Sequence, residues 1–199
     1  LQLIGSRPAP PELRHALYQR CRPQLDDEGM RVHRLLPLAP LAPPELAGDV
    51  LQAILAIGRD DDRARLLTAV TPRLAPAQLG ALLPLAAQFA EPYPFQALLA
   101  AVVARLPAAW LPEALRLVHA RAGVLLPPTA LAAVMARWDD LTAVAGVDAE
   151  AELVLTLEAF ARGGSAFLLA ALRVLLPRLA HVDGGLPGRL ADELVARES

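Results

Sequence analysis

The pentapeptide APPEL occurs twice in the chain, at residues 9–13 and 42–46, and related pentapeptides follow it at the same step. APAQL stands at 75–79 and PAAWL at 107–111, so the spacings are 33, 33 and 32 residues. Self-similarity at a fixed period of this size is the signature of a repeat architecture. The spacing therefore predicts that the chain from residue 9 to residue 122 is built from regular structural repeats.

Each pentapeptide ends in a leucine that begins an apolar stripe. The residues four positions after this leucine are all aliphatic: Leu17, Val50, Leu83 and Leu115. The residues eight positions after it are mostly apolar: Cys21, Ile54, Ala87 and His119. A spacing of four places side chains on one face of a helix, and a proline fits the first helical turn because its missing N–H would have no partner there. Each pentapeptide therefore predicts a turn followed by a helix, called helix B of its repeat.

A second helix, called helix A, is predicted before each later pentapeptide. The three segments are 30–41, 61–74 and 93–106, and their last leucines, Leu41, Leu74 and Leu106, hold one register. Upstream of these leucines, Leu67 aligns with Leu99 and Val70 with Val102, which gives a one-sided apolar stripe. The predicted unit is helix A, a proline turn and helix B.

After residue 122 the period lengthens. Further helix B starts stand at AEAEL, 149–153, and LPGRL, 186–190, at steps of 42 and 37 residues, with helix A segments predicted at 129–138 and 166–179. Units of this kind must stack on their neighbours to bury their apolar faces. We therefore predict an all-α fold, an α-solenoid of stacked helix–turn–helix repeats, in one domain that covers residues 1–199. Its repeats are regular over 9–122 and irregular over 123–199.

Composition narrows the class of protein. A hydrophobic content of 55% excludes a disordered chain, and a net charge of −2 supplies no positive field to attract nucleic acid or anionic membranes. A single cysteine allows no intrachain disulfide and indicates a reducing, cytoplasmic compartment. The chain opens with LQLIGS and not with methionine or a signal peptide, so we expect it to be a fragment of a longer chain.

A membrane-spanning helix is not predicted. The longest stretch without charged residues runs from Leu74 to Ala90, and it is 17 residues long with two prolines and two glutamines inside it. A spanning helix requires about 20 consecutive, mostly apolar residues. We therefore expect no membrane partner.

The stretch GRDDDRARLLTAVTPRLAPAQLGALLPLA, residues 58–86, resembles the degenerate HEAT-like helical repeats of large bacterial multidomain signalling proteins. The resemblance covers residues 31–122 well and the remainder loosely, whereas the signature motifs of ankyrin and tetratricopeptide repeats are missing. Such repeats often lie beside an NTPase or a caspase-like protease module. The resemblance implies a sensor, scaffold or partner-binding role, and it supplies no catalytic residue.

Acidic clusters are interpreted as features of helix ends. Asp60, Asp61 and Asp62 suit a metal ion by their chemistry, but they stand at the start of a predicted helix, where acids cap free N–H groups and interact favourably with the helix dipole. We interpret them as capping residues. The pairs Asp26–Asp27 and Asp139–Asp140 receive the same interpretation, in turns.

Catalytic and metal-binding motifs are not found. The four histidines, His15, His33, His119 and His181, are scattered without metal-ligand spacing. Cys21 falls on the apolar stripe, so we expect a small buried hydrophobic residue and not a nucleophile. Gly163, Gly164 and Ser165 indicate the end of one helix and the N-cap of the next. The sequence predicts no catalytic residue, no metal site and no cofactor.

These observations favour a non-enzymatic helical-repeat module of a larger bacterial signalling protein, serving protein–protein interaction or acting as a scaffold. Its partner would be a protein, a peptide or another domain of the same longer chain. The alternative is a sensor domain that binds a small ligand or peptide in its groove and regulates an attached effector.

A binding surface is predicted on helix B, five and six positions after the repeat leucine, where residues lie off the apolar stripe. Leucines occur there in three successive repeats, and where they are exposed they form an apolar ridge, edged by polar side chains, that marks a binding groove. The predicted ridge consists of Leu51, Gln52, Leu85, Gln88, Arg116 and Leu117. The alternative is that a wide apolar stripe buries these leucines between repeats.

Overall fold

The computed structural model describes residues 47–124 and 128–182, apart from the side chains of 180–182, together with a few isolated earlier residues. The isolated residues are Pro10, Glu12, Ala16, Val32, His33, Leu35 and Leu36. The helix B predicted to start at LPGRL lies outside the described residues, as do the repeat leucines Leu13 and Leu46.

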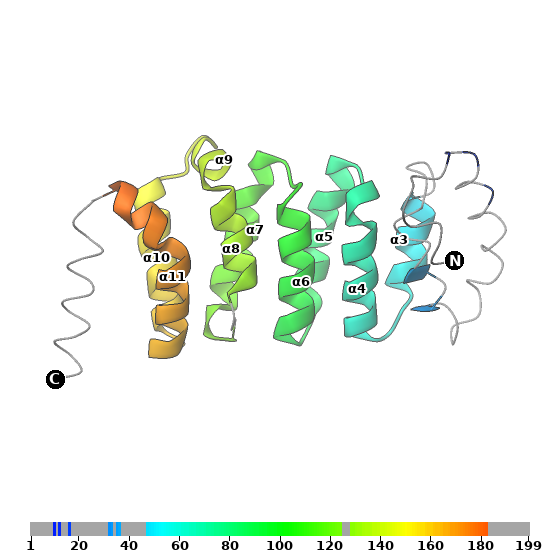
Figure 1. Ribbon diagram of the computed structural model, residues 1–199, viewed down its shortest axis with the longest axis horizontal. Helices are drawn as coiled ribbons and strands as arrows, with labels where there is room; N and C mark the ends of the chain where they lie inside the picture. Colours follow the sequence, from blue (N-terminus) through cyan, green and yellow to red (C-terminus); the bar gives the residue numbers. More distant parts are fainter. Residues whose placement is uncertain are drawn as a thin grey trace. The chain divides into compact units, whose positions relative to one another are not determined.

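The chain divides into two compact units, Leu1–Leu106 and Pro107–Ser199 (Figure 1). The helices described in the first unit are α3 (Ala47–Leu55), α4 (Asp60–Val70), the 3₁₀ turn η5 (Thr71–Arg73), α5 (Pro76–Gln88) and α6 (Pro92–Val103). Those described in the second unit are the 3₁₀ turn η6 (Ala108–Trp110), α7 (Leu111–Ala120), the 3₁₀ turn η7 (Ala122–Val124), α8 (Thr129–Ala136), α9 (Trp138–Thr142), α10 (Ala149–Ala161) and α11 (Ser165–Val182). The described residues contain no strand, which confirms the all-α prediction for them.

Two of the predicted helix B starts are stabilised by side chains that bond free backbone N–H groups. Helix α5 begins at Pro76, and the Gln78 side chain accepts a hydrogen bond of 2.9 Å from the backbone N–H of Ala75, which satisfies one donor at the helix start. Helix α10 begins after Asp148, whose carboxylate accepts from the backbone N–H groups of Glu150 and Ala151. These interactions fix where helix B starts in two of the repeats.

The described parts of the apolar stripes form the core. The repeat leucines Leu79 and Leu111 are buried, and so is Leu153. The aligned helix A residues are also buried: Leu67, Leu99, Val70, Val102, Leu74 and Leu106. These residues are buried as the predicted stripes require, whereas Ala87 and His119, eight positions after the repeat leucine, are half-buried.

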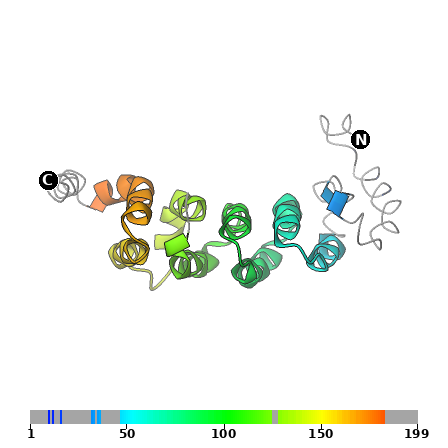
Figure 2. The same ribbon diagram turned by 90° about the horizontal axis from the view of Figure 1, so that it is seen from below.

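Within each unit the helices form two layers. In the first unit, α3 packs on α4 and α5 packs on α6, and α4 lies beside α6 (Figures 1 and 2). In the second unit, α7 packs on α8 and α10 on α11, and these two hairpins contact each other through α7 with α10 and α8 with α11. Each unit therefore contains helical hairpins that pack on one another.

The pairing of helices differs from the predicted unit. We expected helix A to pair with helix B across the proline turn. In the first unit the extensive contacts are instead between α4 and α6, both helices A, and between each helix B and the helix A that follows it, as in α5 with α6. The turn between these partners is short, since only Phe89, Ala90 and Glu91 separate α5 from α6. A short connection brings two antiparallel helices into contact along their length.

Candidate functional site

The predicted ridge residues lie on three different helices. Leu51 and Gln52 are on α3, and Leu85 and Gln88 are on α5, all in the first unit, whereas Arg116 and Leu117 are on α7 in the second unit. The three leucines are half-buried, and Gln52, Gln88 and Arg116 are exposed. Each leucine therefore lies at the margin of its buried stripe, and the continuous ridge remains a prediction.

Arg116 has an acidic neighbour on its own helix. Its Nη1 atom lies 2.6 Å from Oε2 of Glu113, one turn earlier, and the arginine side chain is largely exposed. Solvent screens an ion pair of this kind, so it contributes little to stability. The guanidinium remains accessible at the surface of α7.

Two neighbouring clefts occur on α4, which is a helix A, and sequence reasoning missed both. The first cleft has a volume of about 480 Å³. Its lining residues are Val32, His33, Leu36, Ile57, Gly58, Arg59, Asp62 and Arg65. The second cleft, between α4 and α6, has a volume of about 420 Å³. Its lining residues are Asp61, Asp62, Ala64, Arg65, Thr68, Tyr93, Pro94 and Ala97.

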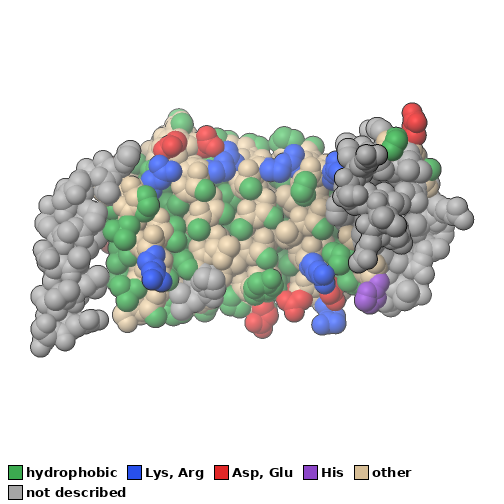
Figure 3. Space-filling model, in the orientation of Figure 1, with side chains coloured by type: hydrophobic (Ala, Val, Ile, Leu, Met, Phe, Trp, Pro, Cys, Tyr) green, Lys and Arg blue, Asp and Glu red, His purple; other side chains and the backbone are tan. Residues whose placement is uncertain are grey.

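Asp62 and Arg65 line both clefts, so the two hollows adjoin on one helix. Asp62 is paired with Arg59 at 3.6 Å, while Arg65 is exposed and forms no ion pair with any described residue. Tyr93 is the most exposed large aromatic side chain among the described residues, with 78% of its surface accessible. Figure 3 shows acidic and basic side chains gathered near the ends of α4 and α6 where these helices begin. The clefts therefore combine fixed charges with an accessible aromatic ring.

The acidic cluster at the start of α4 lies in the first helical turn as predicted, but it does not form the predicted capping hydrogen bond. Asp60, Asp61 and Asp62 lie in the first turn, as expected, but the N-cap residue is Arg59 and no side chain caps it. The capping hydrogen bond is therefore not formed. Asp60 instead pairs with Arg63 and accepts a hydrogen bond of 3.4 Å from the backbone N–H of Ala90.

This arrangement links α4 to the turn between α5 and α6. The Arg63 guanidinium lies 5.1 Å from the centre of the Phe89 ring, a cation–π distance, and its Nη1 atom donates to the carbonyl oxygen of Ile57. Phe89 is fully buried. The contacts made by Asp60 and Arg63 hold two successive hairpins together at the end of α4 that borders the clefts.

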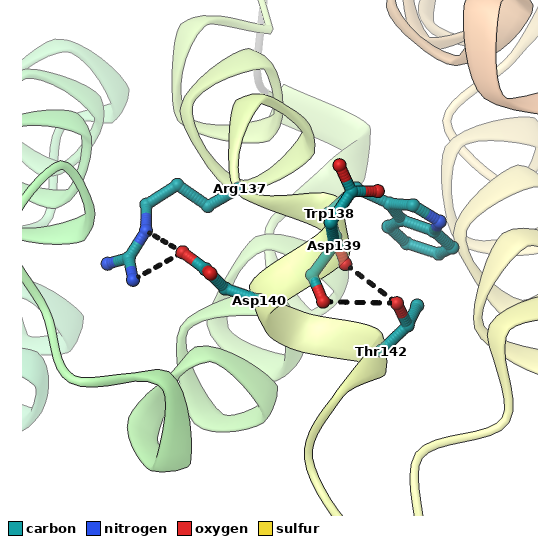
Figure 4. Close-up of polar contacts among 5 residues, drawn as sticks. All are labelled: Arg137, Trp138, Asp139, Asp140 and Thr142. Atoms are coloured by element: carbon teal, nitrogen blue, oxygen red, sulfur yellow. Dashed lines mark hydrogen bonds and ion pairs between the residues drawn. The ribbon is translucent and has the colours of Figure 1, made fainter.

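The second predicted acidic pair is also in a helix and not in a turn. Asp139 and Asp140 lie in the first turn of α9, and Asp140 accepts hydrogen bonds of 2.9 Å and 2.7 Å from Nε and Nη2 of Arg137 (Figure 4). Asp139 accepts from Nη1 of Arg178 on α11 at 3.2 Å. The same arginine reaches the carbonyl oxygen of Met135 at the end of α8. Both carboxylates therefore form ion pairs, and the pair between Asp139 and Arg178 joins α9 to α11.

His119 forms a polar contact inside the second unit. Its Nε2 atom lies 2.8 Å from Oγ1 of Thr156 on α10, and this hydroxyl donates to the carbonyl oxygen of Glu152 at 2.7 Å. Because the hydroxyl donates its hydrogen to that carbonyl oxygen, it can only accept from the histidine, so the ring nitrogen Nε2 carries a hydrogen and is the donor. Desolvation by burial lowers the pKa of His119, and the positive charge of Arg162 lowers it further. Both effects favour the neutral imidazole.

The remaining sequence candidates are placed as follows. Gly163 and Gly164 end α10, with Gly164 at φ +107°, and Ser165 is the first residue of α11 and not its N-cap. Cys21, His15, Asp26 and Asp27 lie outside the described residues, as does the side chain of His181. Across the part of the chain that the structure describes, no group of three or more metal-ligating side chains comes together.

Among these described residues, no helix combines the length and the apolar character needed to cross a bilayer. Comparisons of the chain with models of protein families, with curated proteins and with solved structures found no match.

Proposed function

We propose that this chain is a helical-repeat interaction module, an α-solenoid of HEAT-like type in a bacterial signalling protein, and that it binds a protein or peptide segment. The observation that carries the proposal is the pair of adjoining clefts on α4, which share Asp62 and Arg65. Adjoining clefts along one helix present an extended surface, which suits a chain-like ligand. The scaffold role assigned to such repeats requires a surface of this kind.

The lining of the second cleft combines charged, polar and apolar groups. Two carboxylates, a guanidinium, a hydroxyl and a phenol lie there beside the apolar groups of Ala64, Pro94 and Ala97. Exposed charges of both signs around a tyrosine suit the polar backbone and charged side chains of a peptide. The sensor domain that binds a small ligand or peptide in its groove stays the alternative.

The proposal is tested with a displayed library of random 15-residue peptides selected against the full chain. Selected peptides are then measured by isothermal titration with Tyr93→Ala and Arg65→Glu, which change exposed side chains and should leave the fold intact. We expect each variant to weaken binding by about tenfold or more, the loss of one good contact at an interface. Gln88→Ala serves as the control, because Gln88 is exposed on α5 and lines neither cleft.

Peptides that bind the wild-type chain and both cleft variants with equal affinity would show that the clefts are not the binding surface. If Gln88→Ala alone weakens binding, the predicted helix B ridge is favoured instead. Failure to select any peptide, together with saturable binding of small metabolites, would support the sensor alternative.

A further inference from the structure

The second cleft receives an acidic and an aromatic side chain from matching positions of two neighbouring helices. Asp61 is the second residue of α4 and Tyr93 is the second residue of α6, and these helices lie side by side (Figure 1). Both side chains line the cleft and both are exposed. Neither forms an ion pair or a ring contact with any described residue. The carboxylate and the ring are therefore available to a ligand.

The chain itself shows how such a pair of groups holds an arginine. The guanidinium of Arg63 pairs with the carboxylate of Asp60 and lies 5.1 Å from the centre of the Phe89 ring. The carboxylate attracts the positive charge, and the ring face adds a cation–π interaction. In the cleft, Asp61 and Tyr93 offer the same two groups, and no described arginine contacts either of them.

A positive charge lies one helical turn further along the cleft. Arg65 is exposed, lines the cleft and follows Asp61 by four residues on the same face of α4. The two side chains form no ion pair with each other, and four residues of an α-helix span about 6 Å. In an extended peptide, side chains two residues apart point to the same side and are separated by about 6.5 Å. An extended segment along α4 can therefore place a base opposite Asp61 and an acid opposite Arg65.

A hydroxyl without a partner lies in the same cleft. Thr68 is half-exposed, and its Oγ1 atom is the only buried side-chain oxygen or nitrogen among the described residues that forms no hydrogen bond. An unpaired buried polar atom costs stability, so such atoms are few in folded proteins. A threonine in a helix adopts two side-chain rotamers. Rotation about χ1 would turn this hydroxyl toward the cleft, where a peptide N–H or C=O group can bond it.

We propose that the second cleft binds an extended peptide segment in which one residue separates an arginine from an acidic residue. The arginine lies between the Asp61 carboxylate and the Tyr93 ring, the acid pairs with Arg65, and the Thr68 hydroxyl bonds the peptide main chain. This inference rests on the proposed function and names the ligand of its second cleft. A segment with charges of one sign only is rejected, because it places like charges opposite one another.

Three displayed libraries of 15-residue peptides, selected against the full chain, test the specificity. They differ only at two central positions separated by one random residue. These positions are arginine then glutamate in the first library, glutamate then arginine in the second, and glutamine at both in the third. We expect a charged library to be retained about tenfold better than the glutamine library, the effect of one good charged contact.

Isothermal titration of a selected peptide then identifies the contacts. Replacement of its arginine by glutamine should weaken binding by about tenfold, and so should Asp61→Asn in the chain. The two changes together should cost far less than the product of their separate effects, because they remove the same contact. Tyr93→Phe keeps the ring and should retain the affinity that Tyr93→Leu loses. Glu150→Gln is the matched control, because Glu150 is an exposed carboxylate in the first turn of α10 and lines neither cleft.

Thr68→Val tests the hydroxyl. Valine has the same shape without the polar atom, so the melting temperature should stay equal or rise while the peptide affinity falls. A lower melting temperature with unchanged affinity would assign the hydroxyl a purely structural role and remove it from the proposed site.

Equal retention of the three libraries overturns the proposal, and so does equal weakening of the arginine peptide and its glutamine version by Asp61→Asn. The proposed function fails in a different way. Peptides from the glutamine library that lose affinity with Tyr93→Leu would leave peptide binding in the cleft and overturn only its specificity for arginine. Peptides that no cleft variant affects would contradict the proposed function as well.

Discussion

His119 on α7 donates a hydrogen bond of 2.8 Å from Nε2 to Oγ1 of Thr156 on α10, and the Thr156 hydroxyl donates a hydrogen bond to the carbonyl oxygen of Glu152. These two hydrogen bonds join two hairpins of the second unit. His119 occurs at a stripe position that holds Ile54 in an earlier repeat, where the side chain is buried and apolar. A histidine is accommodated here because a hydroxyl of the adjacent hairpin satisfies its ring N–H.

This contact predicts a pH dependence of stability. Desolvation and then Arg162 lower the pKa of His119 in the folded chain, so the unfolded chain binds its proton more readily. The contribution to stability is therefore fully present above the unfolded pKa of about 6.5, and it is lost as the pH falls from there through the folded pKa. Urea unfolding between about pH 8 and about pH 5 measures the loss.

His119→Gln provides the control for that measurement, because an amide N–H can still donate to Thr156 but does not titrate. Its free energy of unfolding should vary less over this pH range than that of the wild type. Equal slopes in the two proteins would show that other groups control the pH dependence.

Two glycines of the second unit should differ in how much their replacement by alanine destabilises the fold. A Cβ atom added at Gly163 would lie 2.6 Å from Cα of Gly123 and 3.1 Å from the Phe167 ring, so backbone must move. We expect Gly163→Ala to destabilise the fold by about 1–3 kcal/mol, the cost of overpacking. A Cβ at Gly123 meets its nearest atom, Cα of Gly163, at an ordinary 3.5 Å. Gly123→Ala should therefore change stability by less than about 0.5 kcal/mol in the same urea measurement.

Substitutions at the repeat leucines should destabilise the fold far more than substitutions at exposed positions of helix B. Leu79 and Leu111 are fully buried, so truncation of either to alanine should cost about 2–5 kcal/mol in thermal or urea unfolding. Gln52→Ala, at an exposed position of α3, should cost far less. Equal effects at the two kinds of position would contradict the repeat register.

The helix B ridge is tested by Leu85→Glu combined with Leu117→Glu. Both leucines are half-buried, so a glutamate can turn its carboxylate to water, and we expect the double variant to fold with a melting temperature lowered by a few degrees. If the ridge binds a partner, peptides selected against the wild type should lose affinity for this variant. A collapsed melting transition measured by circular dichroism would instead show that both leucines belong to the core.

Local features of the sequence determined the helices. Helix α5 begins at Pro76, and Leu79 and Leu83 follow it four residues apart. The proline suits the first helical turn, and the apolar stripe gives the helix one face to bury. The same periodicity identified Leu67, Val70 and their counterparts as core residues. Hydrophobic periodicity is a property of neighbouring residues, so it is readable without the fold.

Tertiary structure alone decided which helices pair and which polar groups meet. Asp60 reaches the N–H of Ala90, thirty residues away, and His119 reaches Thr156, thirty-seven residues away, and no local pattern encodes either contact. The clefts on α4 likewise depend on the spacing between successive hairpins. Periodicity specifies the face that a helix buries, but the partner for that face depends on loop lengths and side-chain volumes summed over several helices.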